Sequence, residues 1–207
     1  MKINSFTANN ISFQKNLVAS CAVIKEGASF PCKIFELEEF IDKDYFQNLK
    51  KDKDWRKNYF LDTMHYKIKW KAVDDKIFVL EDEAEKCLGY VLLSEDYFTS
   101  NKMDIIFLET CPAYIKENNK KKESQIKYVG ETLLSFIARL LKGTKTEGIC
   151  IPQPSNKAIP FYIKNCGFER DDTFRQGLIL KEEQFNKLIN KNEEHTGSSI
   201  NIFEFLY

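Results

Sequence analysis

The chain has 207 residues, of which 43% are hydrophobic and 30% are charged. Its 31 basic and 31 acidic side chains balance, which does not favour a polyanion as a required partner. This charge balance leads us to expect that the protein binds no nucleic acid. No stretch reaches the roughly 18 consecutive apolar residues of a membrane span, so we also expect a cytoplasmic protein that binds no membrane.

A length of this order suits one domain with extensions at its ends. Residues 1–20 are rich in Asn and Ser without hydrophobic periodicity, and they are predicted to form a flexible tail. We expect the domain to span residues 21–190 and a second tail to cover 191–207. Either a monomer or a homodimer is compatible with this composition.

The six cysteines are scattered along the chain and never form a Cys-x-x-Cys pair. Most have apolar neighbours, which predicts reduced and largely buried thiols. The two histidines, His65 and His195, give almost no support for a zinc site of the usual spacing. We therefore predict a protein that works without a metal ion.

The first half of the chain predicts one strand, one or two helices and then three strands. Residues 33–37 can form the first strand, and apolar residues at near-helical spacing follow it. Short runs of branched and aromatic residues at 76–80 and 88–93, separated by an acidic turn, have the pattern of a hairpin. A third run at 104–109 ends before Pro112, which cannot donate a backbone hydrogen bond.

The second half alternates helices with short strands. Residues 115–125 are polar and aperiodic, which predicts a mobile surface loop. A strongly amphipathic helix over 129–143, a strand at 149–151, a helix over 155–166 and a strand at 174–180 follow. This order predicts an α/β (α+β) fold with a mixed, mostly antiparallel central sheet flanked by helices.

Together with two local motifs, this order resembles the GNAT superfamily of acyl-coenzyme A-dependent N-acyltransferases. The first motif lies between the third antiparallel strand and the amphipathic helix, where the family has Gln/Arg-x-x-Gly-x-Gly/Ala. In the register that we prefer, Gln125 opens the motif, Tyr128 replaces its first glycine and Gly130 is its second. In the alternative register, Lys127 opens the motif and Thr132 replaces the second glycine.

In the family, the backbone amides of this motif hold the pyrophosphate of the coenzyme. The physical basis is general, because a helix N-terminus offers unpaired N–H groups and the positive end of the helix dipole. Tyr128 keeps its backbone N–H and can therefore still bind phosphate. A positive φ at this position, however, is costly for a bulky residue.

The second motif starts at Ser155, where the family commonly has Asn, and Asn156 follows it. Either side chain can cap the helix, and in the family the equivalent side chain also contacts the coenzyme. Pro160 predicts an irregular first turn. The family commonly has the pattern Asn-x-x-Ala-x-x-x-Tyr-x-x-x-Gly-Phe here, and the residues matched to its Ala, Tyr, Gly and Phe are Ala158, Tyr162, Gly167 and Phe168.

The resemblance places Tyr162 at the general-acid position, where a phenol gives a proton to the departing thiolate. Simple packing on the sheet is the alternative role for this side chain. The attacking amine must lose a proton, and Glu109 or a water is the expected general base, with Glu81 and Asp82 in reserve. Glu109 can instead point outward and be solvated, or pair with a lysine.

The resemblance thus implies an N-acetyltransferase that transfers acetyl from acetyl-coenzyme A to a primary amine of unknown identity by direct attack. A catalytically inactive, GNAT-like protein that binds the coenzyme or another ligand is the alternative. The backbone of residues 108–111 is expected to pair with the pantetheine arm like an added strand. The residues expected to bind the coenzyme are Leu108, Thr110, Gln125, Lys127, Tyr128, Val129, Gly130, Glu131, Ser155 and Asn156.

Overall fold

The computed structural model describes residues 16–37, 44–55, 58, 60–64, 75–95, 101–114, 126–172 and 177–203. The strands within these ranges are β1 (Asn16–Lys25), β2 (Ala28–Glu36), β3 (Lys76–Asp82), β4 (Cys87–Glu95), β5 (Lys102–Thr110), β6 (Ile126–Lys127), β7 (Gly148–Ile151), β8 (Glu169–Arg170), β9 (Leu178–Lys181) and β10 (Asn201–Ile202). The helical segments are α2 (Tyr45–Leu49), α4 (Val129–Leu141), α5 (Phe185–Thr196), the π-helical η3 (Phe161–Asn165) and the 3-10 turns η1 (Pro112–Tyr114) and η4 (Glu182–Gln184).

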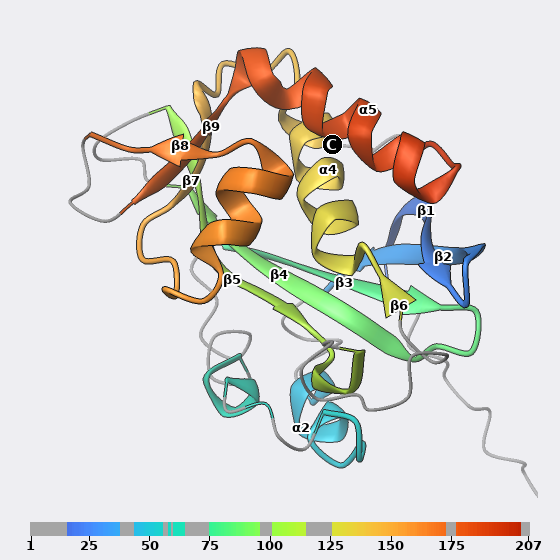
Figure 1. The fold of residues 1–207 in the computed structure, drawn as a ribbon. Helices are drawn as coiled ribbons and strands as arrows, with labels where there is room; N and C mark the ends of the chain where they lie inside the picture. The colour runs from blue at the N-terminus through green and yellow to red at the C-terminus, as the bar shows by residue number, and fades with distance from the viewer. Residues whose placement is uncertain are drawn as a thin grey trace, which may run out of the picture.

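The strands form one sheet in the order β10-β1-β2-β3-β4-β5-β7-β9-β8, with β6 also paired to β1. Among the described pairings, β5 with β7 is parallel and every other pair is antiparallel. Helices α4, α5 and η3 cover one face of the sheet, and α2 lies on the other (Figure 1). This arrangement confirms the mixed, mostly antiparallel sheet flanked by helices that the sequence predicts.

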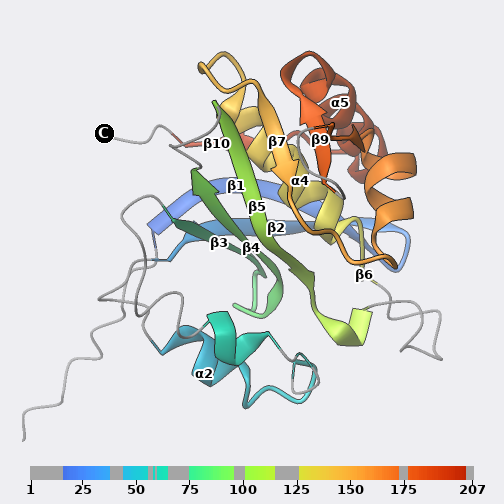
Figure 2. The same cartoon turned by 90° about the vertical axis from the view of Figure 1, so that its left-hand side faces the viewer.

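Strands β5 and β7 pair over a short distance only. Their parallel register joins Lys102 to Gly148 and Asp104 to Cys150, and no pairing continues beyond that point. The two strands lie side by side at one end and then diverge (Figure 2). The second half of β5 therefore has an open edge in the middle of the sheet.

A separate hydrophobic core lies on each face of the sheet. On the helical face, the apolar stripe of α4 packs against the central strands, and Phe136 contacts Phe78 of β3 edge to face. On the other face, Trp55 stacks on Tyr90 of β4 and donates a hydrogen bond from its indole N–H to the Cys87 carbonyl at 2.9 Å. Trp55 thus closes the core on this face of the sheet.

Gly89 lets α4 approach the sheet closely. A Cβ atom at this position would lie 2.7 Å from Val129 Cγ1 and 2.8 Å from the Glu109 carbonyl oxygen, so any larger residue would displace its neighbours. The first turn of α4 is consequently held directly over β4 and β5.

Two parts of the predicted organisation need correction. Residues 16–20 belong to β1, which forms a hairpin with β2 through Glu26 and Gly27, both with positive φ. Residues 191–203 are not a tail, because they contain the end of α5 and the short strand β10, which pairs with β1. The boundaries expected at residues 21 and 190 therefore fall inside a strand and a helix.

All six cysteines are buried and free. In the part of the chain that the structure describes, no cluster of His, Cys, Asp and Glu side chains is arranged to hold a metal ion. Within the same residues, no helix has the length and the apolar character that crossing a bilayer requires.

Candidate active site

Two cavities open beside β5 and meet along its second half. The first, which we call the α4 cavity, has a volume of about 830 Å³ and lies between β5, the start of α4, η3 and α5. The second, the β5–β7 cavity, has a volume of about 580 Å³ and lies between the open edge of β5 and the residues after β7. Both are lined by Leu108, Glu109, Ser155, Ala158 and Tyr162.

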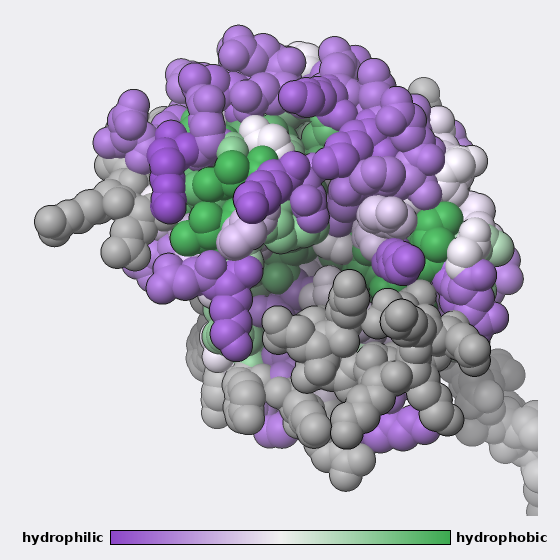
Figure 3. Space-filling view, viewed as in Figure 1, coloured by the Kyte–Doolittle hydropathy of each residue, from purple (hydrophilic) through white to green (hydrophobic). Residues whose placement is uncertain are grey.

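The two cavities follow the divergence of β5 and β7, which leaves room between the strands. The space-filling view shows hydrophobic residues among hydrophilic ones around η3, with the surface hollowed below that segment (Figure 3). The two cavities therefore share a wall at the place where β5 and β7 diverge.

Most of the predicted site residues lie together in the α4 cavity. Lys127 is an exposed residue of β6 that pairs with Ile24, and Asn156 is exposed; neither lines either cavity. Gln125 and the loop predicted at 115–125 lie outside the described residues. The predicted residues that line the α4 cavity are Leu108, Glu109, Thr110, Tyr128, Val129, Gly130, Glu131, Ser155 and Tyr162.

The start of α4 has the backbone conformation of a glycine motif although it carries a tyrosine. Tyr128 has φ 68° and ψ 11°, in the left-handed region. This conformation costs a residue other than glycine roughly 1–2 kcal/mol. The helix begins with the hydrogen bond from the Thr132 N–H to the Tyr128 carbonyl at 2.8 Å, so the N–H groups of the three residues between them have no intrahelical acceptor.

Gly130 allows the first turn of α4 to lie against η3. A Cβ atom there would lie 3.3 Å from Cζ of Phe161 and 3.7 Å from the Thr110 hydroxyl. The free N–H groups of this turn and the positive end of the helix dipole suit an anionic group in the α4 cavity.

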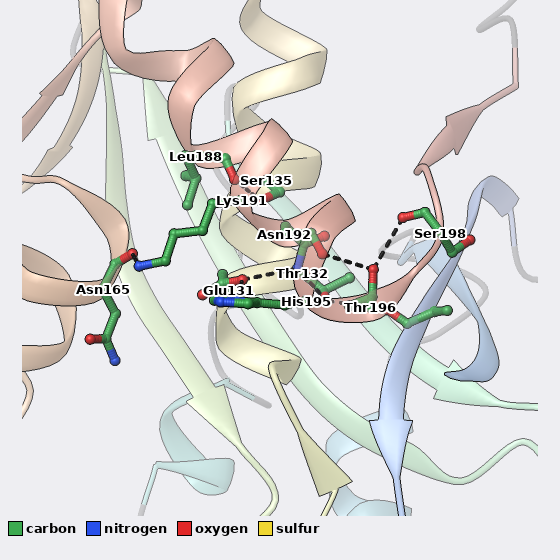
Figure 4. Close-up of polar contacts among 11 residues, drawn as sticks. Glu131, Thr132, Ser135, Asn165, Leu188, Lys191, Asn192, His195, Thr196 and Ser198 are labelled. Atoms are coloured by element: carbon green, nitrogen blue, oxygen red, sulfur yellow. Dashed lines mark hydrogen bonds and ion pairs between the residues drawn. The ribbon is translucent and has the colours of Figure 1, made fainter. Parts of the chain in front are cut away.

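His195 was given no role by sequence reasoning, yet it lines the α4 cavity. Its ring stacks on Tyr128 with centroids 4.5 Å apart and planes 23° from parallel. Its Nδ1 lies 2.8 Å from Glu131 Oε1 (Figure 4). Because a carboxylate accepts hydrogen bonds and does not donate them, Nδ1–H is the donor.

Lys191 is a second α5 residue in this cavity that the sequence did not indicate. Its Nζ donates a hydrogen bond to the Asn165 carbonyl at the end of η3, at 2.6 Å (Figure 4). Helix α5 thus contacts both predicted motifs, the α4 start through His195 and η3 through Lys191. The spacing of Phe185, Leu188 and Ile189 indicates a helix that packs on the core, but it does not place Lys191 or His195 in the cavity.

Glu109 lies where the two cavities meet. The side chain is half-buried, and burial raises its pKa to about 7. Among the described residues it forms no ion pair, so it is not a surface carboxylate paired with lysine. The reserve candidates have other tasks, since buried Glu81 accepts a hydrogen bond from the Tyr45 hydroxyl at 2.6 Å and Asp82 accepts backbone N–H groups of a turn.

Tyr162 lines both cavities and also packs in the core, with its ring edge to face against Phe168. Burial raises the pKa of its phenol well above the usual value, and the nearby Cys166 and Glu109 raise it further. The hydroxyl therefore keeps its proton at any physiological pH. It is a weaker acid than a free phenol and a permanent hydrogen-bond donor.

The second motif departs from the family pattern in spacing. Four residues separate Tyr162 from Gly167, one more than in the family sequence Tyr-x-x-x-Gly-Phe. The π-helical turn of η3 accommodates the additional residue, since each hydrogen bond of such a turn spans one residue more than in an α-helix.

The first turn of this segment is irregular, as Pro160 predicts. The Ser155 carbonyl accepts hydrogen bonds from the N–H groups of Ala158 at 2.9 Å and Ile159 at 3.2 Å. Only the backbone carbonyl of Ser155 makes these hydrogen bonds. Within the described residues, neither the Ser155 hydroxyl nor the Asn156 side chain caps this segment, so the predicted side-chain cap is not formed.

No family model and no curated protein matches the sequence, whereas solved structures match the fold. One is a protein from Desulfovibrio desulfuricans assigned as a GNAT-family acetyltransferase, with a TM-score of 0.53 and 11% identity over 73% of this chain and 99% of that one. Another is a variant of the toxin AtaT bound to the C-terminus of the antitoxin AtaR, with a TM-score of 0.52 and 16% identity over 76% and 96% of the two chains.

A second AtaT structure, with acetyl-CoA also bound, has a TM-score of 0.51 and 15% identity over 77% of this chain and 98% of that one. These likenesses show that the chain has the GNAT fold, as the two motifs and the order of elements predict.

Proposed function

We propose that this protein is an N-acetyltransferase that transfers acetyl from acetyl-coenzyme A to a primary amine. One observation carries the proposal: Glu109 and Tyr162 both lie where the α4 cavity meets the β5–β7 cavity. A base and a hydrogen-bond donor at the junction of two binding cavities are what transfer between two substrates requires.

The α4 cavity suits the acyl donor. Its pyrophosphate would lie at the start of α4, against the N–H groups that follow Tyr128. The open edge of β5 at Leu108 and Thr110 offers backbone groups to the pantetheine arm. The AtaT structure that holds acetyl-CoA supports this choice of donor for the fold.

The proposed chemistry uses the two side chains at the junction of the cavities. The amine arrives mostly as ammonium, and Glu109, with its pKa raised to about 7, is both partly ionised and basic enough at neutral pH to accept a proton. The amine nitrogen bonds to the acetyl carbon, the carbon–sulfur bond breaks, and Tyr162 protonates the departing thiolate. Of the two protons that the ammonium loses, one is released and one returns to Tyr162 through solvent.

A binding protein without turnover is the second candidate, because Tyr128 and His195 add two rings to the wall where a coenzyme would lie. The two candidates differ in one measurement. Calorimetric titration with acetyl-CoA, followed by a free-thiol assay over a panel of amines, should give both binding and thiol release for an enzyme. Binding without thiol release from any amine would favour the second candidate, and absence of binding would refute both as stated.

The variant Tyr162→Phe tests the catalytic step. It should bind acetyl-CoA as the wild type does, while kcat falls by about 10²–10⁴-fold, the usual range for a lost acid catalyst. Tyr45→Phe is the matched control, because it removes a buried phenol hydroxyl that lies at neither cavity. Equal activity of Tyr162→Phe and wild type would remove Tyr162 from the mechanism.

A further inference from the structure

Tyr128 occupies a conformation that its own side chain disfavours, so something else in the structure must hold it. The glycine of the family motif adopts a positive φ without strain, whereas Tyr128 has φ 68° with a Cβ atom present. The ring of His195 stacks on Tyr128, with the two ring centroids 4.5 Å apart.

We infer that His195 is a positioning residue for the coenzyme: by stacking on Tyr128 it holds the left-handed turn that presents the α4 N–H groups to the pyrophosphate. The inference rests on the proposed function, and it assigns to α5 a part of the site that lies outside both family motifs. His195 does not take part in the chemistry.

The position of His195 is itself fixed from several directions. Glu131, which is only 3% exposed, accepts the hydrogen bond from His195 Nδ1 and lies within 3.4 Å of Asn192 Nδ2. The Asn192 amide also donates to the Thr132 hydroxyl at 3.1 Å (Figure 4). The imidazole is therefore tied to the first turn of α4 both by its own bond and by its neighbour one turn earlier in α5.

Further contacts along α4 and α5 keep the two helices in register. The Ser135 hydroxyl donates to the Leu188 carbonyl at 3.4 Å, and Arg139 pairs with Glu193. Since α5 cannot slide along α4 without breaking these bonds, the ring of His195 stays over Tyr128. The stack is thus built into the helix pair and does not depend on a flexible side chain reaching across solvent.

The inference makes a prediction about two positions taken together. His195→Ala should weaken acetyl-CoA binding by about 3- to 10-fold, the range that the loss of one aromatic stack gives. Tyr128→Gly supplies the second background for this comparison, because glycine adopts the left-handed turn unaided. In the Tyr128→Gly background, His195→Ala should change the dissociation constant by less than about twofold.

One further variant separates the stacking of the imidazole from its hydrogen bond, and a second variant is a control. His195→Phe keeps a ring that can stack but loses the hydrogen bond to Glu131, and it should recover most of the affinity that His195→Ala loses. Asn190→Ala is the matched control, because Asn190 is an exposed neutral residue of α5 that lines none of the cavities described. It should leave the dissociation constant unchanged.

All variants are titrated with acetyl-CoA by calorimetry at a temperature where thermal unfolding shows each of them to be folded. A loss of affinity that is equal in the two backgrounds would mean that His195 contacts the coenzyme directly, which overturns the inference. An unchanged affinity of His195→Ala in the wild-type background overturns it as well. If the wild-type protein binds no acetyl-CoA, the proposed function itself is refuted. The results with the variants test the role of His195 alone.

Discussion

The two cavities that meet at Glu109 differ in the chemical character of the residues that they do not share. The α4 cavity offers backbone N–H groups and charged or polar side chains, among them Glu131, Lys191 and His195. The β5–β7 cavity is lined mainly by apolar side chains, including Phe60 and Phe107, whose ring centroids are 5.4 Å apart. Changes on one side should therefore alter the binding of one substrate and leave the other substrate unaffected.

A change at the junction of the two cavities should lower kcat itself, so that saturation with either substrate does not restore the rate. Glu109→Gln removes the base and should lower kcat by about 10²-fold or more. In the wild type, kcat/KM should rise with pH and level off above about 7, because only the ionised carboxylate accepts a proton and burial raises its pKa to about 7. This rising limb, the increase of kcat/KM up to about pH 7, should be absent from the pH profile of Glu109→Gln.

Tyr162→Phe is the control for that pH profile. It should be slow but should keep the limb near pH 7, since Glu109 is intact and the raised pKa of Tyr162 lies far above this range. A limb that persists in Glu109→Gln would assign the titration to another group and leave water as the base.

On the donor side, Gly130→Ala should weaken acetyl-CoA binding by about tenfold, because overpacking a tight contact carries a penalty of this order. The new Cβ would lie 3.3 Å from Cζ of Phe161, so this ring would have to shift by a few tenths of an ångström. The dissociation constant for acetyl-CoA and the KM for the amine are the two measurements. A rise in the amine KM with unchanged coenzyme binding would contradict the division between the cavities.

Glu109 should also affect the free energy of unfolding, and its raised pKa fixes how that effect changes with pH. The folded protein favours the protonated carboxyl, so this contribution is complete below the ordinary pKa of 4.5 and is lost as the pH rises through about 7. Glu109→Gln mimics the protonated form. Its Tm should match wild type at pH 4 and exceed it by about 2–4 °C at pH 8, the shift that about 1 kcal/mol produces in a chain of this size.

Sequence patterns predicted the elements that carry a strong apolar periodicity, among them β3, β4, β5 and α4. They missed β1, because the predicted N-terminal tail extended to residue 20, whereas the strand begins at Asn16 and is paired along its length with β2. They also missed the extent of α5, because two of its buried positions are the polar Asn192 and Thr196. Asn192 contacts Glu131 and Thr132, which are distant in sequence, so the burial of its side chain cannot be deduced from the sequence of α5 alone.

The candidate site shows the same limit. The motifs indicated Tyr128, Gly130 and Tyr162, and the unfavourable φ expected at Tyr128 is present. His195 could not be placed, since it reaches the site only because α5 packs along α4. The extra residue before Gly167 was visible in the sequence, but only the π-helical turn explains how the segment accepts it.

On the acceptor side, the lining of the β5–β7 cavity predicts which amines are used. Among its described residues Glu109 is the one carboxylate, and Phe60 and Ile106 are exposed apolar side chains on its wall. An amine with an aromatic or alkyl body should therefore have a higher kcat/KM than a polyamine such as spermidine, since the described residues of this wall offer one carboxylate to a polycation. Free-thiol release over matched concentrations of both kinds of amine measures the difference.

Phe60→Ala should raise the KM of the preferred aromatic amine by about threefold, a small effect because the ring is already 46% exposed. Binding of acetyl-CoA should stay the same, since Phe60 lines the β5–β7 cavity and not the α4 cavity. Leu17→Ala, which removes an exposed apolar side chain of β1 remote from both cavities, is the control. If Phe60→Ala changed acetyl-CoA affinity as much as amine KM, the β5–β7 cavity would belong to the donor, and the acceptor would have to enter elsewhere.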